Sequence, residues 1–203
     1  MPMMSTRCAT DGALLERVLV VALEVFGRYG FRETSMEDVA RSADISRQGL
    51  YLHFANKEAL FRAVVRQELD TALDEVSRRL NEEGVGLDRR VVVALDAWLG
   101  RYVGSMLAPS SRTCWRIPRF QLKDVVEAAS SAFDTRLAEA IASAPTENDH
   151  RRLGVTPAEV ATVLHTVGQG AKYLSSSREE FVARVTATTH LVFAGFRTTT
   201  ERP

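Results

Sequence analysis

The chain has 203 residues, of which 26 are basic and 26 acidic, so its formal net charge at pH 7 is zero. This length allows a buried core without disulfide or metal support, and 45% hydrophobic with 26% charged residues is typical of a globular protein rather than a disordered or fibrous one. Neutral charge also argues against a nucleic-acid-binding protein, whose binding surface is usually basic.

Apolar residues recur at intervals of three and four along most of the chain, which predicts amphipathic helices. The first such stripe covers residues 14–29. Thr34 and Glu37 have the spacing of a capping box, which predicts the start of a short second helix. Ser46 is expected to cap a third short helix, and Asn56 is expected to cap a longer fourth one.

The second half of the chain continues the helical pattern after a break at residues 81–86. One helix is expected over residues 91–106 and a longer one over residues 122–141. Capping boxes at residues 156–159 and 177–180 predict the starts of the last two helices. No stretch alternates in the manner of a strand, so the predicted fold class is all-α, with about nine helices.

Two of the predicted short helices lie on either side of a turn at residues 43–46. This is the layout of a helix-turn-helix, in which the second helix lies in the major groove of DNA and the first crosses its backbone. The second helix carries Arg47 and Gln48, whose side chains suit guanine and adenine respectively. Gly49 within that helix costs about 1 kcal/mol relative to alanine; either a close approach to DNA or the packing of the two helices would explain it.

The same region carries a longer pattern, made of residues 26–31 (FGRYGF), 34–36 (TSM), 43–46 (ADIS), 49–54 (GLYLHF) and 57–60 (KEAL). The pattern closely resembles the N-terminal domain of TetR/AcrR-family transcriptional regulators over residues 13–66. Asp44 and Ile45 stand where the family more often has Gly and Val, and Gln48 stands where small or basic residues are common. These departures concern the operator sequence rather than the fold.

The resemblance implies a helix-turn-helix DNA-binding domain over residues 1–57, ordered from about residue 11, and a helical ligand-binding and dimerisation domain over residues 58–203. It also implies a dimer bound to a double-stranded, pseudo-palindromic DNA operator. The DNA-contacting residues carried over by position are Thr34, Ser35 and Lys57 for phosphates, Arg47 and Gln48 for bases, and Tyr51 and His53 for phosphate or a thymine methyl. Gly49 is a further candidate, from its cost within the helix rather than from the resemblance.

The C-terminal half matches the family only in its helix pattern, so its ligand site is predicted from side-chain types. Small-molecule sites are mostly apolar, with a few polar groups that orient the ligand. The candidate site for a small apolar or aromatic effector consists of Trp98, Tyr102, Met106, Trp115, Phe120, Phe133, His165, Gln169 and Tyr173. The alternative is that most of these side chains belong to the core.

The last two predicted helices, at about residues 157–174 and 178–197, carry more apolar side chains than one internal face needs. Pairing with the same helices of a second chain would make an isologous four-helix interface. Gly168 and Gly170 would allow the partner helix to approach closely. We therefore expect a homodimer through these two helices.

Other function classes find little support in the residues. The chain has no Gly-x-Ser-x-Gly elbow, no phosphate-binding glycine loop and no His-Glu-x-x-His motif, so we expect neither an enzyme nor a cofactor or metal site. The longest apolar run, residues 18–23, is too short to cross a membrane, and no signal peptide is recognisable. Two cysteines, Cys8 and Cys114, make no disulfide framework, which favours the cytoplasm. A redox role for Cys114 is an alternative to an inert thiol.

Together these patterns predict a ligand-responsive transcriptional regulator, a repressor that a small effector releases from DNA. An activator with the same DNA-binding head is one alternative, and an all-α carrier or enzyme is another. The neutral charge is then an average, because residues 41–66 carry five basic and two acidic side chains, a net charge of plus three. With so few cations, we expect weak non-specific binding and a shallow salt dependence.

Overall fold

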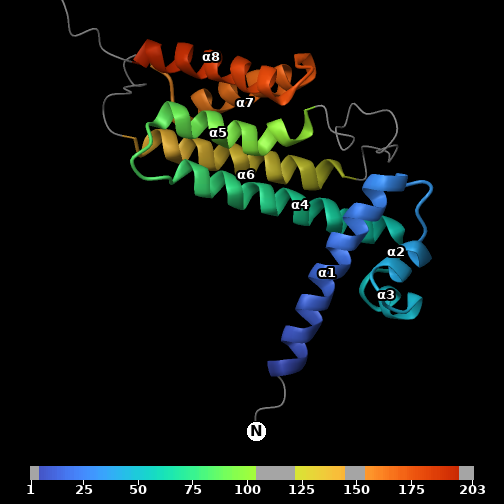
Figure 1. The fold of residues 1–203 in the computed structure, drawn as a ribbon. Helices are drawn as coiled ribbons and strands as arrows, with labels where there is room; N and C mark the ends of the chain where they lie inside the picture. Colours follow the sequence, from blue (N-terminus) through green and yellow to red (C-terminus); the bar gives the residue numbers. More distant parts are fainter. Residues whose placement is uncertain (1–4, 104–121, 145–153, 197–203) are drawn as a thin grey trace, which may run out of the picture. The chain divides into compact units, whose positions relative to one another are not determined.

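The computed structural model describes residues 5–103, 122–144 and 154–196. These residues contain helices and no strand, which confirms the all-α fold class (Figure 1). The elements are α1 (Ser5–Tyr29), α2 (Met36–Ser42), α3 (Arg47–His53), α4 (Lys57–Leu80), α5 (Leu87–Leu99), the 3-10 helix η1 (Gly100–Tyr102), α6 (Lys123–Ala142), α7 (Pro157–Leu174) and α8 (Arg178–Phe196). The described part therefore has eight α-helices where about nine were expected for the whole chain. Within it, no helix is long and apolar enough to span a membrane.

The chain divides into two compact units. The first comprises residues 1–69 and 109–125, and the second comprises residues 70–108 and 126–203. Helices α4 and α6 each contribute residues to both units. The boundary that we expect after residue 57, between a DNA-binding and a ligand-binding domain, divides the chain by function and stays a prediction.

The first unit packs α1, α2, α3 and the start of α4 around one apolar core. Its buried side chains are Val18, Ala22, Val25, Phe26, Met36, Val39, Ala40, Ala43, Leu50, Phe54, Leu60, Phe61 and Val64. The rings of Phe26 and Phe31 lie 5.0 Å and 5.2 Å from the ring of Phe61, centre to centre, both in edge contacts. The apolar stripe predicted over residues 14–29 is the inner face of α1, although Tyr29 at its end is exposed.

The caps of α2 and α3 show one correction. Ser35, not Thr34, is the N-cap of α2, and its capping box is completed by Asp38 rather than Glu37. The box predicted one residue earlier is wrong because Thr34 faces inward, where its hydroxyl donates a 2.8 Å hydrogen bond to the carbonyl of Gly30. The predicted cap of α3 is confirmed, since the hydroxyl of Ser46 accepts a hydrogen bond from a backbone N–H in the first turn.

The predicted caps of the longer helices are mostly confirmed. The side chain of Asn56 accepts a 2.8 Å hydrogen bond from a backbone N–H of α4, and Thr156 and Glu159 form the predicted box at the start of α7. At the start of α8 the hydroxyl of Ser177 caps the helix as expected. The carboxylate of Glu180, however, reaches back to Ser176 rather than to the cap.

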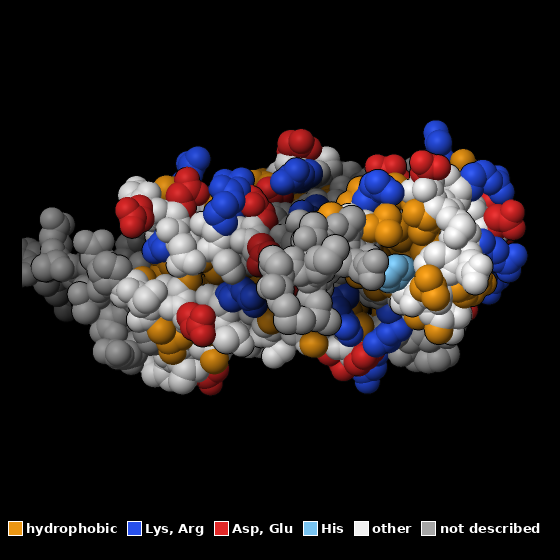
Figure 2. Space-filling view, turned by 90° about the horizontal axis from the view of Figure 1, so that it is seen from below, with side chains coloured by type: hydrophobic (Ala, Val, Ile, Leu, Met, Phe, Trp, Pro, Cys, Tyr) orange, Lys and Arg blue, Asp and Glu red, His pale blue; other side chains and the backbone are white. Residues whose placement is uncertain are grey.

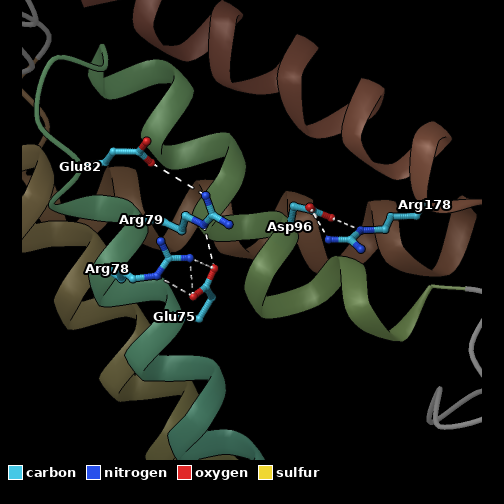
Figure 3. Close-up of polar contacts among 6 residues, drawn as sticks. All are labelled: Glu75, Arg78, Arg79, Glu82, Asp96 and Arg178. Atoms are coloured by element: carbon cyan, nitrogen blue, oxygen red, sulfur yellow. Dashed lines mark hydrogen bonds and ion pairs between the residues drawn. The ribbon is translucent and has the colours of Figure 1, made fainter.

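The second unit contains one helix that ends earlier than predicted. A single helix was expected over residues 91–106, but α5 ends at Leu99 and continues as the short 3-10 helix η1. A Cβ atom on Gly100, the C-cap residue, would collide with the carboxylate of Asp96. The same carboxylate accepts two hydrogen bonds, of 2.9 Å and 2.7 Å, from the guanidinium of Arg178, the first residue of α8 (Figure 3).

Charged side chains also gather at the end of α4 in this unit. Glu75 accepts hydrogen bonds from Arg78 and Arg79, and these bonds lower the pKa of the Glu75 carboxyl (Figure 3). Arg79 lies 3.9 Å from Glu82 as well. These ion pairs join neighbouring side chains at one end of α4, and we assign them no catalytic role.

Candidate nucleic-acid interface and effector region

The turn between α2 and α3 has the geometry of a helix-turn-helix. Helix α2 ends at Ser42, α3 begins at Arg47, and the backbone of Asp44 between them has a φ of 54°. This left-handed conformation explains why glycine is common at this position of the resembled pattern, and aspartate is among the residues that tolerate it best. The N–H of Ile45 then donates a 3.0 Å hydrogen bond to the carbonyl of Ala40, which closes the turn.

Helix α3 has one buried and one exposed side. Leu50 is fully buried among α1, α2 and α4 residues of the core, so it anchors the helix. Arg47, Gln48, Tyr51 and His53 are all exposed, as base and phosphate contacts require. The structure thus presents to solvent four of the residues predicted to contact DNA.

Arg47 has two side-chain neighbours within the motif. Its guanidinium lies 5.6 Å from the centre of the Tyr51 ring one helical turn away, and hydrogen bonding to Tyr51 raises the pKa of Arg47. On its other side it lies 3.8 Å from the carboxylate of Glu37 on α2. Arg47 therefore bridges the two helices of the motif, with an acidic neighbour that sequence reasoning did not single out.

Both hydroxyls predicted to contact phosphate before α2 have partners inside the chain. Thr34 is buried, so its hydroxyl is turned away from solvent. Ser35 is exposed, and its hydroxyl donates a 2.6 Å hydrogen bond to the carboxylate of Asp38, which helps to lower the pKa of that carboxyl. Ser35 is accessible to DNA, whereas Thr34 is not.

Lys57, predicted to hold a phosphate, points into the loop before α2. Its ammonium group donates hydrogen bonds to the carbonyl oxygens of Phe31 at 2.8 Å, Thr34 at 2.9 Å and Arg32 at 3.3 Å. The sequence offered no signal for these contacts, because they join residues 23 to 26 positions apart. In this structure Lys57 supports the loop.

Gly49 was open to two explanations, close approach of DNA or packing of α2 against α3. A Cβ atom at this position would lie 3.1 Å from the hydroxyl of Ser46 and within 4 Å of no described atom of α2. Packing between the helices therefore does not require the glycine. Room for the cap of α3 does favour it, and the close approach of DNA stays a prediction.

Four of the predicted effector residues meet in the second unit. The rings of Trp98 on α5 and Phe133 on α6 stack at 5.2 Å, and Phe133 meets His165 on α7 edge-on at 4.8 Å. The indole N–H of Trp98 donates a 3.2 Å hydrogen bond to Nε2 of His165, and the amide of Gln169 lies 3.1 Å from the same nitrogen. Nδ1 of His165 lies 2.7 Å from the carboxylate of Asp134, a residue that sequence reasoning missed.

These contacts determine which nitrogen of His165 carries the proton. An indole N–H can only donate, so Nε2 accepts and must be unprotonated. The hydrogen therefore lies on Nδ1 and is donated to Asp134. We refer to Trp98, Phe133, Asp134, His165 and Gln169 as the α5–α7 cluster; it joins three helices through one buried imidazole.

Of the remaining effector candidates, two lie in the described part of the chain. Tyr102 is half-buried in η1. Tyr173 is 58% exposed, with the ammonium of Lys172 at 5.0 Å from its ring centre. Met106, Trp115 and Phe120 lie outside the described residues, as does Cys114.

Helices α7 and α8 pack on one another and each keeps an exposed apolar stripe. On α7 the stripe contains Val163, Val167, Gly170 and Leu174, spaced at three and four residues. On α8 it contains Ala183, Ala187, Leu191 and Ala194 with the same spacing. The expectation that Gly168 faces a partner helix is wrong, because it is buried and a Cβ there would lie 2.9 Å from Leu99 of α5.

Charge is mixed on the face of the molecule drawn in Figure 2. On the face drawn in Figure 2, lysine and arginine side chains lie among aspartates and glutamates, with hydrophobic side chains between them. Neither positive nor negative charge dominates that face. The mixture agrees with the neutral net charge of the sequence.

Residues 18–64 match the family model described as bacterial regulatory proteins, tetR family. This segment contains α2, α3 and the turn between them. Over these residues the chain is similar to the tetR family.

Curated relatives that are named as HTH-type transcriptional regulators match over about a third of the chain. The regulator RutR of Escherichia coli K12 is 43% identical over 64 residues, which are 32% of this chain and 30% of RutR. YfiR of Bacillus subtilis 168, an HTH-type transcriptional regulator described as uncharacterized, is 35% identical over 68 residues, or 34% of this chain and 33% of its own. The match thus spans about a third of the length of these relatives.

Solved structures share the fold over nearly the whole chain. A transcriptional regulator from Cytophaga hutchinsonii superposes with a TM-score of 0.73 at 19% identity, covering 91% of this chain and 98% of its own. The flavonoid-responsive regulator FrrA superposes with a TM-score of 0.62 at 20% identity, covering 93% and 99%. At these identities the likeness establishes the fold of the second unit.

Proposed function

We propose that this chain is a transcriptional regulator that binds a double-stranded DNA operator through α2 and α3, as a repressor. The observation that carries the proposal is the two-sided α3, in which buried Leu50 anchors the helix and Arg47 and Gln48 face solvent. The left-handed turn at Asp44 supports it, as do the curated relatives that are named as transcriptional regulators. Such a regulator would act in the cytoplasm and would not be an enzyme.

Selection of bound fragments from genomic DNA tests this function directly. The wild type is expected to enrich fragments that share a pseudo-palindrome with half-sites about one helical turn apart. Gln48→Ala should lose about 1–3 kcal/mol on that operator and tolerate more bases at one position of each half-site. Equal losses on operator and random DNA would exclude Gln48 from base reading, and no enrichment by the wild type would contradict the function.

We propose that the protein is a homodimer through the exposed stripes of α7 and α8. Four apolar or small side chains on each helix would form an isologous four-helix interface with their counterparts. Leu191→Glu, which places a charge at a 76% exposed leucine, should convert a dimer to a monomer in size-exclusion chromatography with light scattering. Val126→Glu on α6 is the matched control, since that valine is exposed outside both stripes. A monomeric wild type at micromolar concentration would contradict the interface.

We propose that the α5–α7 cluster anchors the polar group of a small aromatic or apolar effector. Its stacked Trp98 and Phe133 provide aromatic rings, and the amide of Gln169 provides polar atoms beside them. An effector can release DNA only by its difference in affinity for the bound and free conformations. Because FrrA is named as flavonoid-responsive, flavonoids are a reasonable first set of aromatic probes.

Thermal-shift screening with flavonoids and other aromatic compounds tests the effector site. A compound that binds there should raise the melting temperature of the wild type and change its tryptophan fluorescence. Gln169→Leu should weaken that response, and Gln67→Leu on α4 is the control. A library without any effect on melting would indicate that the cluster is core. Transcription from an operator-bearing template, with and without protein, distinguishes the repressor from the alternative activator.

A further inference from the structure

Leu52 on α3 is the most exposed large hydrophobic side chain in the described part of the chain, with 80% of its surface accessible. Two residues turn an α-helix by about 200°, so Leu52 projects nearly opposite to the buried Leu50. It also lies four residues after Gln48, which places the two side chains next to each other on the outer face. Leu52 therefore points where α3 would face DNA.

Packing within the chain does not explain this leucine. A side chain that is 80% exposed gains little from burial on folding, and α3 is already anchored by Leu50. Single exposed hydrophobic residues are common on protein surfaces. What distinguishes Leu52 is its place among Arg47, Gln48 and Tyr51, the side chains that form the outer face of the helix.

The major groove offers a specific apolar partner for such a side chain. Among the base edges in that groove, the C5-methyl group of thymine is the apolar feature, and apolar side chains contact it. Leu52 has no hydrogen-bonding group, so the methyl group is the only base feature it can distinguish. Four residues of helix rise by about 6 Å, and stacked bases are about 3.4 Å apart, so Leu52 lies within about two base pairs of the base that Gln48 contacts.

We propose that Leu52 is a specificity-determining residue that contacts the methyl group of one thymine in each half-site, within two base pairs of the position read by Gln48. This inference rests on the proposed DNA-binding function. It adds an apolar contact to the hydrogen-bonding residues Arg47 and Gln48, and it assigns thymine rather than adenine or guanine to one base of the operator.

Replacement of single thymines by deoxyuridine tests the contact, because it removes the methyl group and keeps base pairing. The substrates are the selected operator and versions with each half-site thymine replaced in turn, and the readout is the dissociation constant by fluorescence anisotropy. For the wild type, one replacement per half-site near the Gln48 position should weaken binding about fourfold, the effect of one buried methyl group. Leu52→Ala should bind the unmodified operator more weakly and lose its sensitivity at that position alone.

The role of Leu52 can be overturned without overturning the proposed DNA-binding function. Leu52→Ala should keep the wild-type melting temperature, since the side chain is exposed, and Gln48→Ala should keep the deoxyuridine effect. A wild type that enriches an operator but responds to no deoxyuridine, or a Leu52→Ala protein that keeps the full response, overturns the role of Leu52 only. A wild type that enriches no sequence overturns the DNA-binding function, and this role with it.

Discussion

The ammonium group of Lys57 lies 4.5 Å from the centre of the Phe31 ring and donates a 2.8 Å hydrogen bond to the carbonyl oxygen of that same residue. Its other bonds go to the carbonyls of Arg32 and Thr34. The first residue of α4 thus ties down the loop that leads from α1 into α2. A charged donor shared by three carbonyls stabilises the position of the helix-turn-helix.

Lys57→Met should lower the free energy of unfolding by about 1–3 kcal/mol, because hydrogen bonds to a charged donor are lost and the loop carbonyls need new partners. Urea denaturation measures this loss, with Lys123→Met as a control at an exposed lysine. The salt dependence of DNA binding should be unchanged, since the ammonium is engaged inside the protein. If the slope of log affinity against log salt concentration falls by about one per head, without loss of stability, Lys57 is instead a phosphate contact.

Glu37 should restrain non-specific binding to DNA. Its carboxylate lies 3.8 Å from the guanidinium of Arg47, on the side of α2 that faces α3. Glu37→Gln removes one negative charge per head from the surface proposed to face DNA, so affinity for random DNA should rise and its salt dependence should steepen. Titration of random and operator duplexes at several salt concentrations measures both, and the ratio of the two affinities is expected to fall.

Glu139→Gln on α6 is the matched control for this change, since Glu139 is exposed in the second unit. A rise in random-DNA affinity of the same size in both variants would reflect net charge alone. That result would leave Glu37 without a local role.

Helix periods and caps were predictable because they depend on neighbours three or four residues away. The inner face of α1, the cap at Ser46 and the box at Thr156 were all predicted from such spacing. The cap predicted at Thr34 is wrong because two hydroxyl residues are adjacent in the sequence. The direction of the backbone decides which of the two hydroxyls caps the helix. Its neighbour Ser35 remains exposed and takes the cap.

Contacts between distant residues could not be predicted in the same way. His165 and the Trp98 indole are 67 positions apart, and nothing in the local pattern of either helix pairs them. The Asp134 carboxylate was missed because a single acid on a helix usually faces solvent. Gly168 was expected to contact a partner chain, but Leu95 and Leu99 of its own chain occupy the space beside it.

The ion pair between Arg62 on α4 and Asp124 in the first turn of α6 should make stability depend on acid pH. The two groups meet through hydrogen bonds of 3.0 Å and 2.7 Å, and the bond from Arg62 lowers the pKa of Asp124 to about 2. An ordinary aspartate has a pKa of about 3.9 when unfolded. The contribution of the pair is therefore complete above about pH 4 and is lost as the pH falls towards 2.

Asp124→Asn should remove this contribution. Urea unfolding of wild type and variant from neutral to acid pH should show a constant difference in free energy above pH 4 to 5 that shrinks towards pH 2. Because both proteins keep Glu180, whose pKa also lies at about 2, its titration cancels in the difference. A difference that stays constant to the lowest pH would show that the pair contributes through packing rather than through charge.

Gly168 and Gly170, two residues apart on α7, should respond in opposite ways to the same substitution. A Cβ at Gly168 would lie 2.9 Å from Leu99 and 3.2 Å from Leu95, both buried, so Gly168→Ala should lower the free energy of unfolding by about 1–2 kcal/mol. A Cβ at Gly170 would meet no described atom of the same chain within 4 Å, so in the monomeric Leu191→Glu background, where no partner helix approaches, Gly170→Ala should stabilise the helix by up to about 1 kcal/mol. Denaturation of the two variants at equal protein concentration compares them, and the reverse order would mean that α7 packs on α5 less closely than the structure shows.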